Sequence, residues 1–428
     1  MSPAMRPEGM GRVRCDNPMH RPTHHLIALP TKLGTTNHYQ KGEPLMRPTI
    51  SFRQFSVMFG MVLLAALATH FFVRHAEAKD PPRNPTSLVI ITNWGEDTCS
   101  LIDSEAGKEL AKIAVGLKPY DIKVDPKGRF AYVTCSGANY ISVIDIQAML
   151  ERKDQRIKVG EGPRDIELSE DGKHAVVANS GDDSISVVDI AAKKELYRVP
   201  VGSIPYGVDL TRQDRWAVIT LWGGNKVVLV ELGATSGKVL KTFNVGSLPY
   251  TVVVPDNSDY AIVSCFGSHQ LHVIDLKRLE TLPPVEVGRS PWGLSASVDG
   301  KNVISANFYS GDVSILSVGA PPQIDPADAA TQGLQHHFIA PQTHHAGGHG
   351  ASPPVIERAR IPLAHTDPGE ESFNTRPKNV AFTNDPNVAV LTDLGRNEVL
   401  VLDIAAKKIL RRIAVGKAPY GVAFVPRN

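Results

Sequence analysis

Short apolar stretches with alternating polar positions recur along most of the chain and predict β-strands. One complete copy of the pattern reads as four strands, at Tyr206–Leu210, Trp216–Leu221, Val227–Glu231 and Val239–Val245, separated by turns rich in Gly, Asn and Asp. Strands rich in Val and Ile, with a turn about every ten residues, are typical of all-β proteins. The helical period that a helical solenoid would need is missing from these copies.

A sequence marker shows that this four-strand unit is repeated seven times. Six copies carry Val-Gly-x-x-Pro followed by Tyr, Trp or Arg, and a degraded copy reads Thr-Arg-Pro-Lys at 375–378. The marker prolines are Pro119, Pro163, Pro205, Pro249, Pro291, Pro377 and Pro419. Their spacing is 42 or 44 residues, except for 86 between the fifth and sixth. Four strands in a period of this length make a propeller blade, so we predict an all-β, seven-bladed β-propeller of four-stranded antiparallel blades.

The third strand of each copy carries a second marker. It ends in an acidic residue in six copies, and Ser317 takes that place in the remaining one. The acids are Asp103, Asp145, Asp189, Glu231, Asp275 and Asp403. We expect them to accept hydrogen bonds from the turn that follows, as Asp side chains commonly do.

The two ends of the repeat region predict how the ring closes. Residues Leu88–Asn93 match the second strand of a blade, whereas Tyr420–Val425 match a first strand. The C-terminal strand therefore joins the first blade, which leaves no free sheet edge between the ends of the ring. The predicted propeller covers residues 86–428.

The N-terminal region has the features of an export signal. Phe55–Val73 is apolar and uncharged, basic residues precede it, and the small-x-small triplet Ala76-Glu77-Ala78 follows. This order predicts a signal peptide at residues 46–78 and a periplasmic or secreted protein. An uncleaved membrane anchor is the alternative, because the apolar run is just long enough to span a bilayer. Residues 1–45 are predicted to be a mis-called extension or a disordered tail.

The repeats resemble those of the YVTN β-propeller family. The resemblance is carried by Pro119–Ile122 (PYDI), Asp125–Gly128 (DPKG), Ala131–Gly137 (AYVTCSG) and Ile141–Asp145 (ISVID), and it extends over residues 86–428. It implies an exported seven-bladed propeller with a binding or structural role in the envelope. It does not imply a ligand, because this fold carries unrelated activities.

Composition narrows the classes of partner. Hydrophobic residues make up 42% of the chain, which is sufficient for a substantial core. Lys and Arg total 46 against 44 for Asp and Glu, so overall charge argues against nucleic acid as the partner. A membrane would be contacted only through an uncleaved N-terminal anchor. The four cysteines fit neither a zinc site nor a haem attachment motif. With Cys15 removed, one disulfide plus a thiol and three buried thiols both remain open.

One face of the predicted propeller gathers aromatic and basic residues. First strands line the channel, and the loops before them share a face with the turns between second and third strands. The ring predicted from the marker loops consists of Tyr120, Arg164, Tyr206, Tyr250, Trp292, Lys378 and Tyr420, with Trp94, Trp222, Phe266 and Phe308 nearby. Such a face suits a flat or anionic ligand, so we predict binding of an envelope protein or small ligand. The alternative is that the Pro-aromatic pairs only pack neighbouring blades. Arg164, Trp292 and Lys378 break the repeat, which favours a function there.

Two further hypotheses concern metals. An insertion near residues 319–354 carries His336, His337, His344, His345 and His349, which could bind copper, zinc or nickel, or could be a solvated low-complexity loop. The predicted first strands contain no histidine, but Asp121, Asp165, Glu167 and Asp209 come from three consecutive blades. These acids allow a metal-dependent lactonase- or lyase-like enzyme as an alternative. Without a recognisable catalytic motif, a non-enzymatic binding or scaffold protein without a cofactor is favoured.

Overall fold

A computed structural model of the chain describes residues 87–256, 258–319, 354–364 and 375–426. The chain divides into two units, residues 1–79 and 80–428, and all described residues belong to the second unit. The predicted signal segment and residues 1–45 therefore lie outside the described residues. Within the described ranges, no helix has the length and hydropathy needed to cross a membrane.

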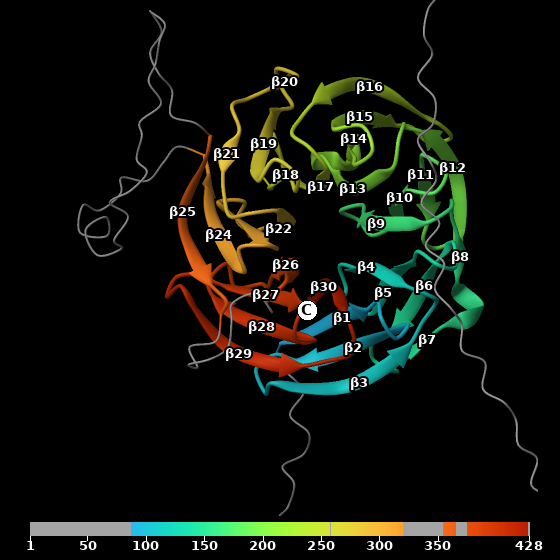
Figure 1. The fold of residues 1–428 in the computed structure, drawn as a ribbon. Helices are drawn as coiled ribbons and strands as arrows, with labels where there is room; N and C mark the ends of the chain where they lie inside the picture. The colour runs from blue at the N-terminus through green and yellow to red at the C-terminus, as the bar shows by residue number, and fades with distance from the viewer. Residues whose placement is uncertain (1–86, 257, 320–353, 365–374, 427–428) are drawn as a thin grey trace, which may run out of the picture. The chain divides into compact units, whose positions relative to one another are not determined.

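Seven antiparallel sheets form the propeller and confirm the predicted fold (Figure 1). The strands of the first four blades are β1 (Leu88–Asn93), β2 (Thr98–Asp103), β3 (Lys108–Ala114) and β30 (Pro419–Val425); β4 (Pro119–Val124), β5 (Phe130–Cys135), β6 (Tyr140–Asp145), β7 (Leu150–Glu151) and β8 (Ile157–Lys158); β9 (Pro163–Leu168), β10 (His174–Asn179), β11 (Ser184–Asp189) and β12 (Lys194–Pro200); and β13 (Pro205–Leu210), β14 (Trp216–Leu221), β15 (Lys226–Leu232) and β16 (Gly237–Asn244).

The remaining three blades repeat this order from the channel outward. Their strands are β17 (Pro249–Val253), β18 (Tyr260–Cys265), β19 (Gln270–Asp275), β20 (Glu280–Thr281) and β21 (Val285–Glu286); β22 (Pro291–Ala296), β23 (Asn302–Asn307), β24 (Asp312–Val318) and β25 (Val355–Pro362); and β26 (Pro377–Phe382), β27 (Val388–Asp393), β28 (Glu398–Asp403) and β29 (Lys408–Ala414). The marker prolines thus begin the inner strands, where a missing N–H is tolerated at a strand end.

The last strand closes the ring by completing the first blade. β30 pairs antiparallel with β1, with Leu88 opposite Val425 and Ile90 opposite Ala423. Gly421 also donates its N–H to the Thr92 hydroxyl at 2.8 Å. The predicted closure is confirmed.

The hydrophobic core lies between neighbouring blades. Ile90 and Leu101 of the first blade pack in one cluster with Ile122, Val133 and Ile144 of the second. All five side chains are fully buried. The middle strands are near-continuous apolar runs because both of their faces are covered by adjacent blades.

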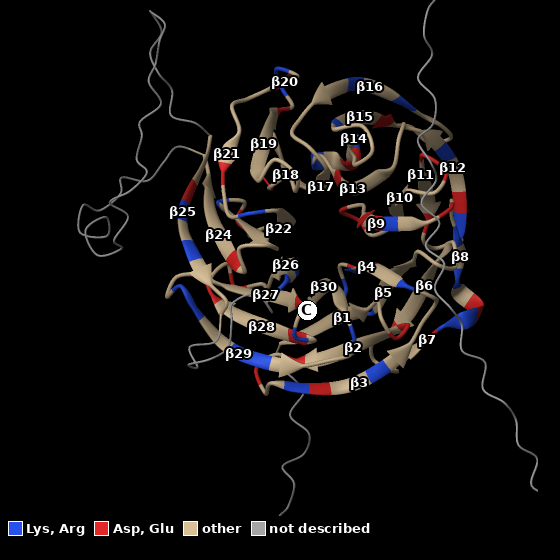
Figure 2. Cartoon of the chain, in the orientation of Figure 1, with Lys and Arg blue, Asp and Glu red and all other residues tan. Residues whose placement is uncertain are grey.

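The outer strand is interrupted in two blades, which the repeat pattern does not predict. A 3₁₀ turn at Lys153–Gln155 separates β7 from β8. Pro283 and Pro284 separate β20 from β21, because two consecutive residues without an N–H cannot continue a ladder. Outer strands such as β3, β12 and β29 are rich in charged residues (Figure 2), and their burial patterns show that these residues are exposed or half-buried.

The loops are arranged as the repeat predicts. The turn after each second strand bonds to the loop before the inner strand, as Trp222 N–H does to the Ile204 carbonyl at 3.0 Å. The acids ending third strands accept hydrogen bonds from the next turn, as in Ala106 N–H to Asp103 at 2.8 Å. Glu231 differs, since it pairs with Lys238 at 3.2 Å.

The strands that flank the insertion show which blade carries it, and three of the cysteines are described. β24 ends at Val318 and β25 begins at Val355, so the insertion joins the third and fourth strands of one blade. Its five histidines lie outside the described residues. Cys99, Cys135 and Cys265 are buried free thiols, which decides between the two cysteine alternatives for the described residues.

Candidate binding face and channel

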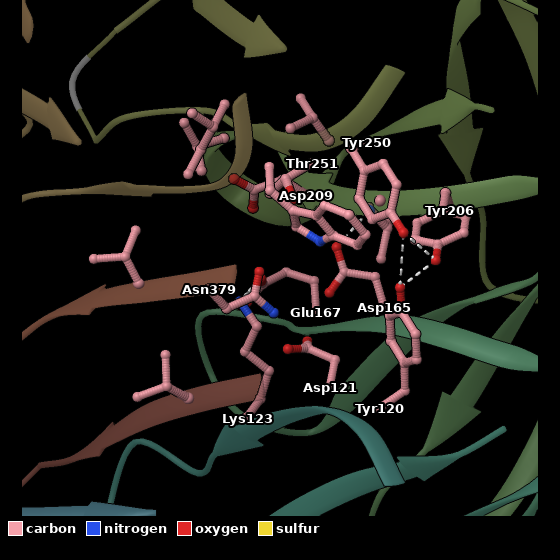
Figure 3. Close-up of a pocket in the computed structure, with 18 of the residues that line it drawn as sticks. Tyr120, Asp121, Lys123, Asp165, Glu167, Tyr206, Asp209, Tyr250, Thr251 and Asn379 are labelled. Atoms are coloured by element: carbon pink, nitrogen blue, oxygen red, sulfur yellow. Dashed lines mark hydrogen bonds and ion pairs between the residues drawn. The ribbon is translucent and has the colours of Figure 1, made fainter. Parts of the chain in front are cut away.

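Four tyrosine side chains converge over the channel. Tyr120, Tyr206, Tyr250 and Tyr420 each follow a marker proline, so their inner strands present them at the same level. The Tyr120 hydroxyl hydrogen bonds with those of Tyr206 and Tyr420, and the Tyr206 and Tyr250 hydroxyls are 2.5 Å apart (Figure 3). Burial raises the pKa of Tyr120 and of Tyr420 well above the usual value, so these two phenols are neutral at physiological pH.

Two of the predicted residues, Tyr120 and Tyr420, are packed within this tyrosine cluster. Tyr120 and Tyr420 are 4% and 6% exposed, and their rings are 4.2 Å apart at the centroids. They join the inner strands of two neighbouring blades, β30 and β4, which are distant in sequence, and this contact supports the packing alternative for these two positions. Neither ring lines the aromatic hollow that lies on the loop face above them.

Beneath the tyrosines, charged residues surround a cavity of about 80 Å³ in the channel. Asp121, Lys123, Asp165, Glu167 and Asp209 point into it from three consecutive inner strands (Figure 3). The Lys123 ammonium lies 2.5 Å from a Glu167 carboxylate oxygen. The four acids were predicted from the sequence, whereas this lysine was missed. Lys123 occupies the same position in its inner strand as Glu167 and Asp209 do in theirs, and this shared position could have identified it from the sequence.

The electrostatics of this cluster depend on Lys123. Burial lowers the lysine's pKa, but Glu167, followed by Asp121, Asp165 and Asp209, outweighs that effect and leaves the pKa raised. Burial, together with neighbouring carboxylates, raises the pKa of Asp165 and of Asp209 well above the usual range. The cluster therefore holds several acids around one ammonium ion and favours protonated carboxyls.

The same acids connect neighbouring blades. Asp165 accepts a hydrogen bond from Val208 N–H at 3.0 Å, and Asp209 accepts one from Val254 N–H at 2.7 Å. These N–H groups belong to the following inner strand or to its end, where no further strand is available as a partner. The carboxylates thus satisfy backbone donors that would otherwise remain unpaired in the channel.

An aromatic hollow of about 600 Å³ lies on the loop face above the tyrosines. Its wall includes Arg164, Tyr206, Trp222, Tyr250, Phe266 and Trp292. The inner strands supply Arg164, Tyr206, Tyr250 and Trp292, and the turns after the second strands supply the other two. Five predicted residues are therefore brought together, along with Phe266, which was expected nearby.

Arg164 is the charged group of this hollow. Its Nε donates to the Ser180 hydroxyl at 3.0 Å. The guanidinium carbon lies 4.7 and 5.3 Å from the Tyr120 and Tyr206 ring centroids. Within the described part of the chain, it has no carboxylate within ion-pair distance, so its terminal nitrogens are available to an anion.

Trp94 and Lys378, the two remaining predicted residues, also lie outside the hollow's wall. Trp94 is 39% exposed, and the Lys118 ammonium lies 5.6 Å from its ring centroid. Lys378 is 5% exposed, and its Nζ lies 2.9 Å from the Trp292 ring centroid. The repeat pattern predicts a shared face for these residues, but it does not separate buried members from open ones.

The described residues contain no group of three or more His, Cys, Asp or Glu side chains arranged to hold a metal ion. The histidines proposed for copper, zinc or nickel are all in the insertion outside those residues. The metal hypothesis at His336, His337, His344, His345 and His349 therefore remains a prediction.

Comparison with solved structures identifies the fold class of this unit. A functionally unknown protein from Desulfotomaculum acetoxidans has a TM-score of 0.64 at 13% identity, covering 80% of this chain and 100% of its own. A protein from Lactobacillus plantarum has a TM-score of 0.60 at 14% identity, covering 79% and 99%. The Kuenenia stuttgartiensis hydrazine synthase has a TM-score of 0.53 at 15% identity, covering 71% and 88%. At these identities the likeness shows the fold alone.

Comparison at the sequence level gives the family. No curated protein matches the chain. The family profile described as YNCE-like beta-propeller matches residues 82–324, which is more than half of the chain. The match includes most of the blades that carry the tyrosine cluster, the charged channel and the aromatic hollow. This chain belongs to the YNCE-like beta-propeller family.

Proposed function

We propose that this protein is a non-enzymatic binding propeller of the cell envelope that uses the aromatic hollow as its ligand site. The observation that carries the proposal is the hollow itself, with five aromatic side chains and one guanidinium group that lacks a carboxylate partner among the described residues. A concave, largely apolar surface with one convergent polar group is typical of small-ligand sites.

The chemistry of the wall specifies the kind of ligand. Aromatic rings favour a flat group that stacks on them, and a guanidinium favours a carboxylate or phosphate. The ligand is therefore a small molecule, or a segment of an envelope protein, that presents a planar group with a negative charge. Nucleic acid is not favoured, because the near balance of charge supplies no general attraction to a polyanion.

The alternative of a metal-dependent lactonase- or lyase-like enzyme is less well supported. Lys123 places an ammonium among the acids of the channel, where the enzyme hypothesis needs a cation site. Asp165 and Asp209 already accept backbone hydrogen bonds from the next blade. A structural role accounts for these acids without a metal ion. Metal handling through the histidine insertion stays a separate prediction, tested by metal content with and without residues 331–350.

Envelope location is part of the proposal. The resemblance of the repeats to the YVTN family and the signal-like segment at residues 46–78 both support a periplasmic or secreted protein. Fractionation of cells that produce the full chain, with N-terminal sequencing of the product, tests the location and cleavage near Ala78.

Calorimetric titration with naphthalene-2-carboxylate and its uncharged carboxamide tests the site. Trp222→Ala is expected to weaken both ligands, because stacking on an aromatic ring contributes about 1–3 kcal/mol. Arg164→Gln is expected to weaken the carboxylate selectively. Trp94→Ala is the matched control, since Trp94 lies outside the hollow's wall. Equal losses in the Trp94 and Trp222 variants would contradict the proposed location.

A further inference from the structure

Lys378 occupies the first position after a marker proline, where four blades carry tyrosine. Its Nζ lies 2.9 Å from the Trp292 ring centroid, 4.7 Å from that of Tyr420 and 4.9 Å from that of Phe308. The residue as a whole is 5% exposed. The amine is thus enclosed by three rings from three other strands or turns of the propeller.

The described surroundings of this amine contain no compensating negative charge. Among the described residues, it has no ion pair and no hydrogen-bond acceptor within reach, whereas the channel lysine, Lys123, has Glu167. The charged group that acts on it is another cation, Arg376, from the same loop. The ionisable group facing it from β30 is the Tyr420 phenol, which burial keeps neutral.

This environment disfavours the ammonium form. Burial, and secondarily Arg376, lowers the pKa of Lys378 to about 6. The rings attract an ammonium by cation–π interaction, but they replace only part of the hydration that the ion loses. A lysine in an apolar site beside a second cation is the arrangement that leaves a primary amine unprotonated and nucleophilic near neutral pH.

We propose that Lys378 is a covalent capture site for small aldehydes or ketones, which it binds as an imine. The nitrogen lone pair forms a bond to the carbonyl carbon, giving a carbinolamine. The carbonyl oxygen takes up one proton from the amine and one from solvent and leaves as water, and the imine nitrogen loses its remaining extra proton to solvent. Formation of the imine needs no oxidant or reductant. Lys378 itself lines neither the outer hollow nor the channel cavity. The rings that it contacts do, because Trp292 borders both spaces and Tyr420 borders the cavity, so a small carbonyl compound would approach the amine past these two rings.

This capture site goes beyond the proposed binding of a planar anion. The amine is not part of the hollow's wall, and its chemistry does not depend on Arg164. A failure of naphthalene-2-carboxylate to bind would leave the proposal for Lys378 unaffected, and failure of the amine to react would leave the hollow unaffected.

Acetaldehyde with sodium cyanoborohydride provides the test on the full chain. The hydride reduces each imine to a stable N-ethyl amine, and peptide mass spectrometry measures the rate at each lysine. We expect Lys378 to be ethylated at pH 7 on the order of ten times faster than Lys118 and Lys417, two exposed lysines. The rate at Lys378 should rise through about pH 6 and then level off.

Two variants make the test specific. Lys378→Met should abolish the fast-labelled site and leave the rates at Lys118 and Lys417 unchanged. Arg376→Met should slow labelling of Lys378 at pH 6, because removing the second cation raises the amine's pKa. Labelling of Lys378 no faster than that of the two exposed lysines, or a rate still rising steeply between pH 8 and pH 10, would overturn the proposal.

Discussion

Removing the channel lysine provides a direct test of the charge cluster. Lys123→Met keeps most of the apolar stem but takes away the one ammonium that faces Asp121, Asp165, Glu167 and Asp209 in the described channel. Breaking a fully buried ion pair costs about 3–5 kcal/mol. The Lys123 side chain is 36% exposed to the channel, so solvent screens part of the interaction. We therefore expect a loss of about 1–3 kcal/mol at pH 8.

The sign of the pH dependence follows from the raised pKa values of Asp165 and Asp209. An acid whose pKa is higher in the folded state contributes stability at low pH and loses it as pH rises through the folded value. Without Lys123 these pKa values rise further. The difference in stability between wild type and variant should therefore be small at pH 5 and grow toward pH 8.

Thermal unfolding followed by circular dichroism measures this difference. At about 2.1 cal/mol/K of unfolding entropy per residue, a unit of about 350 residues should lose about 1.5–4 °C in Tm at pH 8. Lys173→Met is the control, because Lys173 forms an exposed pair with Asp171 and should change Tm by less than about one degree. A difference that is the same at both pH values, or larger at pH 5, would refute the proposed role of Lys123.

Three other perturbations test the fold. Deleting residues 419–428 removes the strand that closes the ring, and the loss of its buried side chains, at about 1.5–3 kcal/mol each, should abolish cooperative unfolding in calorimetry; an unchanged Tm would disprove the closure. Gly300→Ala should lose about 1–3 kcal/mol in urea denaturation, because φ is +68° and a Cβ would meet a carbonyl oxygen of the neighbouring blade at 2.0 Å. Gly224→Ala is the control and should lose less than about 1 kcal/mol, because its Cβ would make only ordinary van der Waals contacts, the nearest at 3.9 Å. Burial raises the pKa of Cys135 to about 11 and of Cys265 to about 12, so a thiol reagent at pH 8 should label them only after denaturation, and rapid labelling of the native protein would contradict their burial.

The repeat made the fold predictable because each blade displays the same local pattern. The marker proline, the apolar alternation and the acid after the third strand each specify a strand or a turn within a few residues, and local signals of this kind are read directly from sequence. The closure by β30 was also predictable. The repeat region begins with a blade that lacks its first strand and ends with a first strand that has no blade of its own, so the two complete each other.

The site was predictable only in part because its contacts join strands that are far apart in sequence. The marker loops placed Tyr120 and Tyr206 on one face, but not their hydroxyls against each other, because the direction of each side chain depends on the tilt of its blade. Lys123 was missed because its counterion comes from the next blade. For Lys378, the break in the repeat was visible in the sequence, but the lack of a charge partner among the described residues was not.

The closing of the ring by its first and last strands has a consequence for folding. The Thr92 hydroxyl accepts a hydrogen bond from Gly421 N–H, 329 residues later, so the first blade stays incomplete until β30 has been synthesised. Bringing together ends separated by that length costs roughly 5 kcal/mol of chain entropy. The strands of each of the other six blades are consecutive in the sequence, so pairing them closes shorter loops and costs less chain entropy. Docking of the final strand is therefore expected to be the slow step of folding. In the intermediate that precedes it, the ring is open and strand edges are exposed.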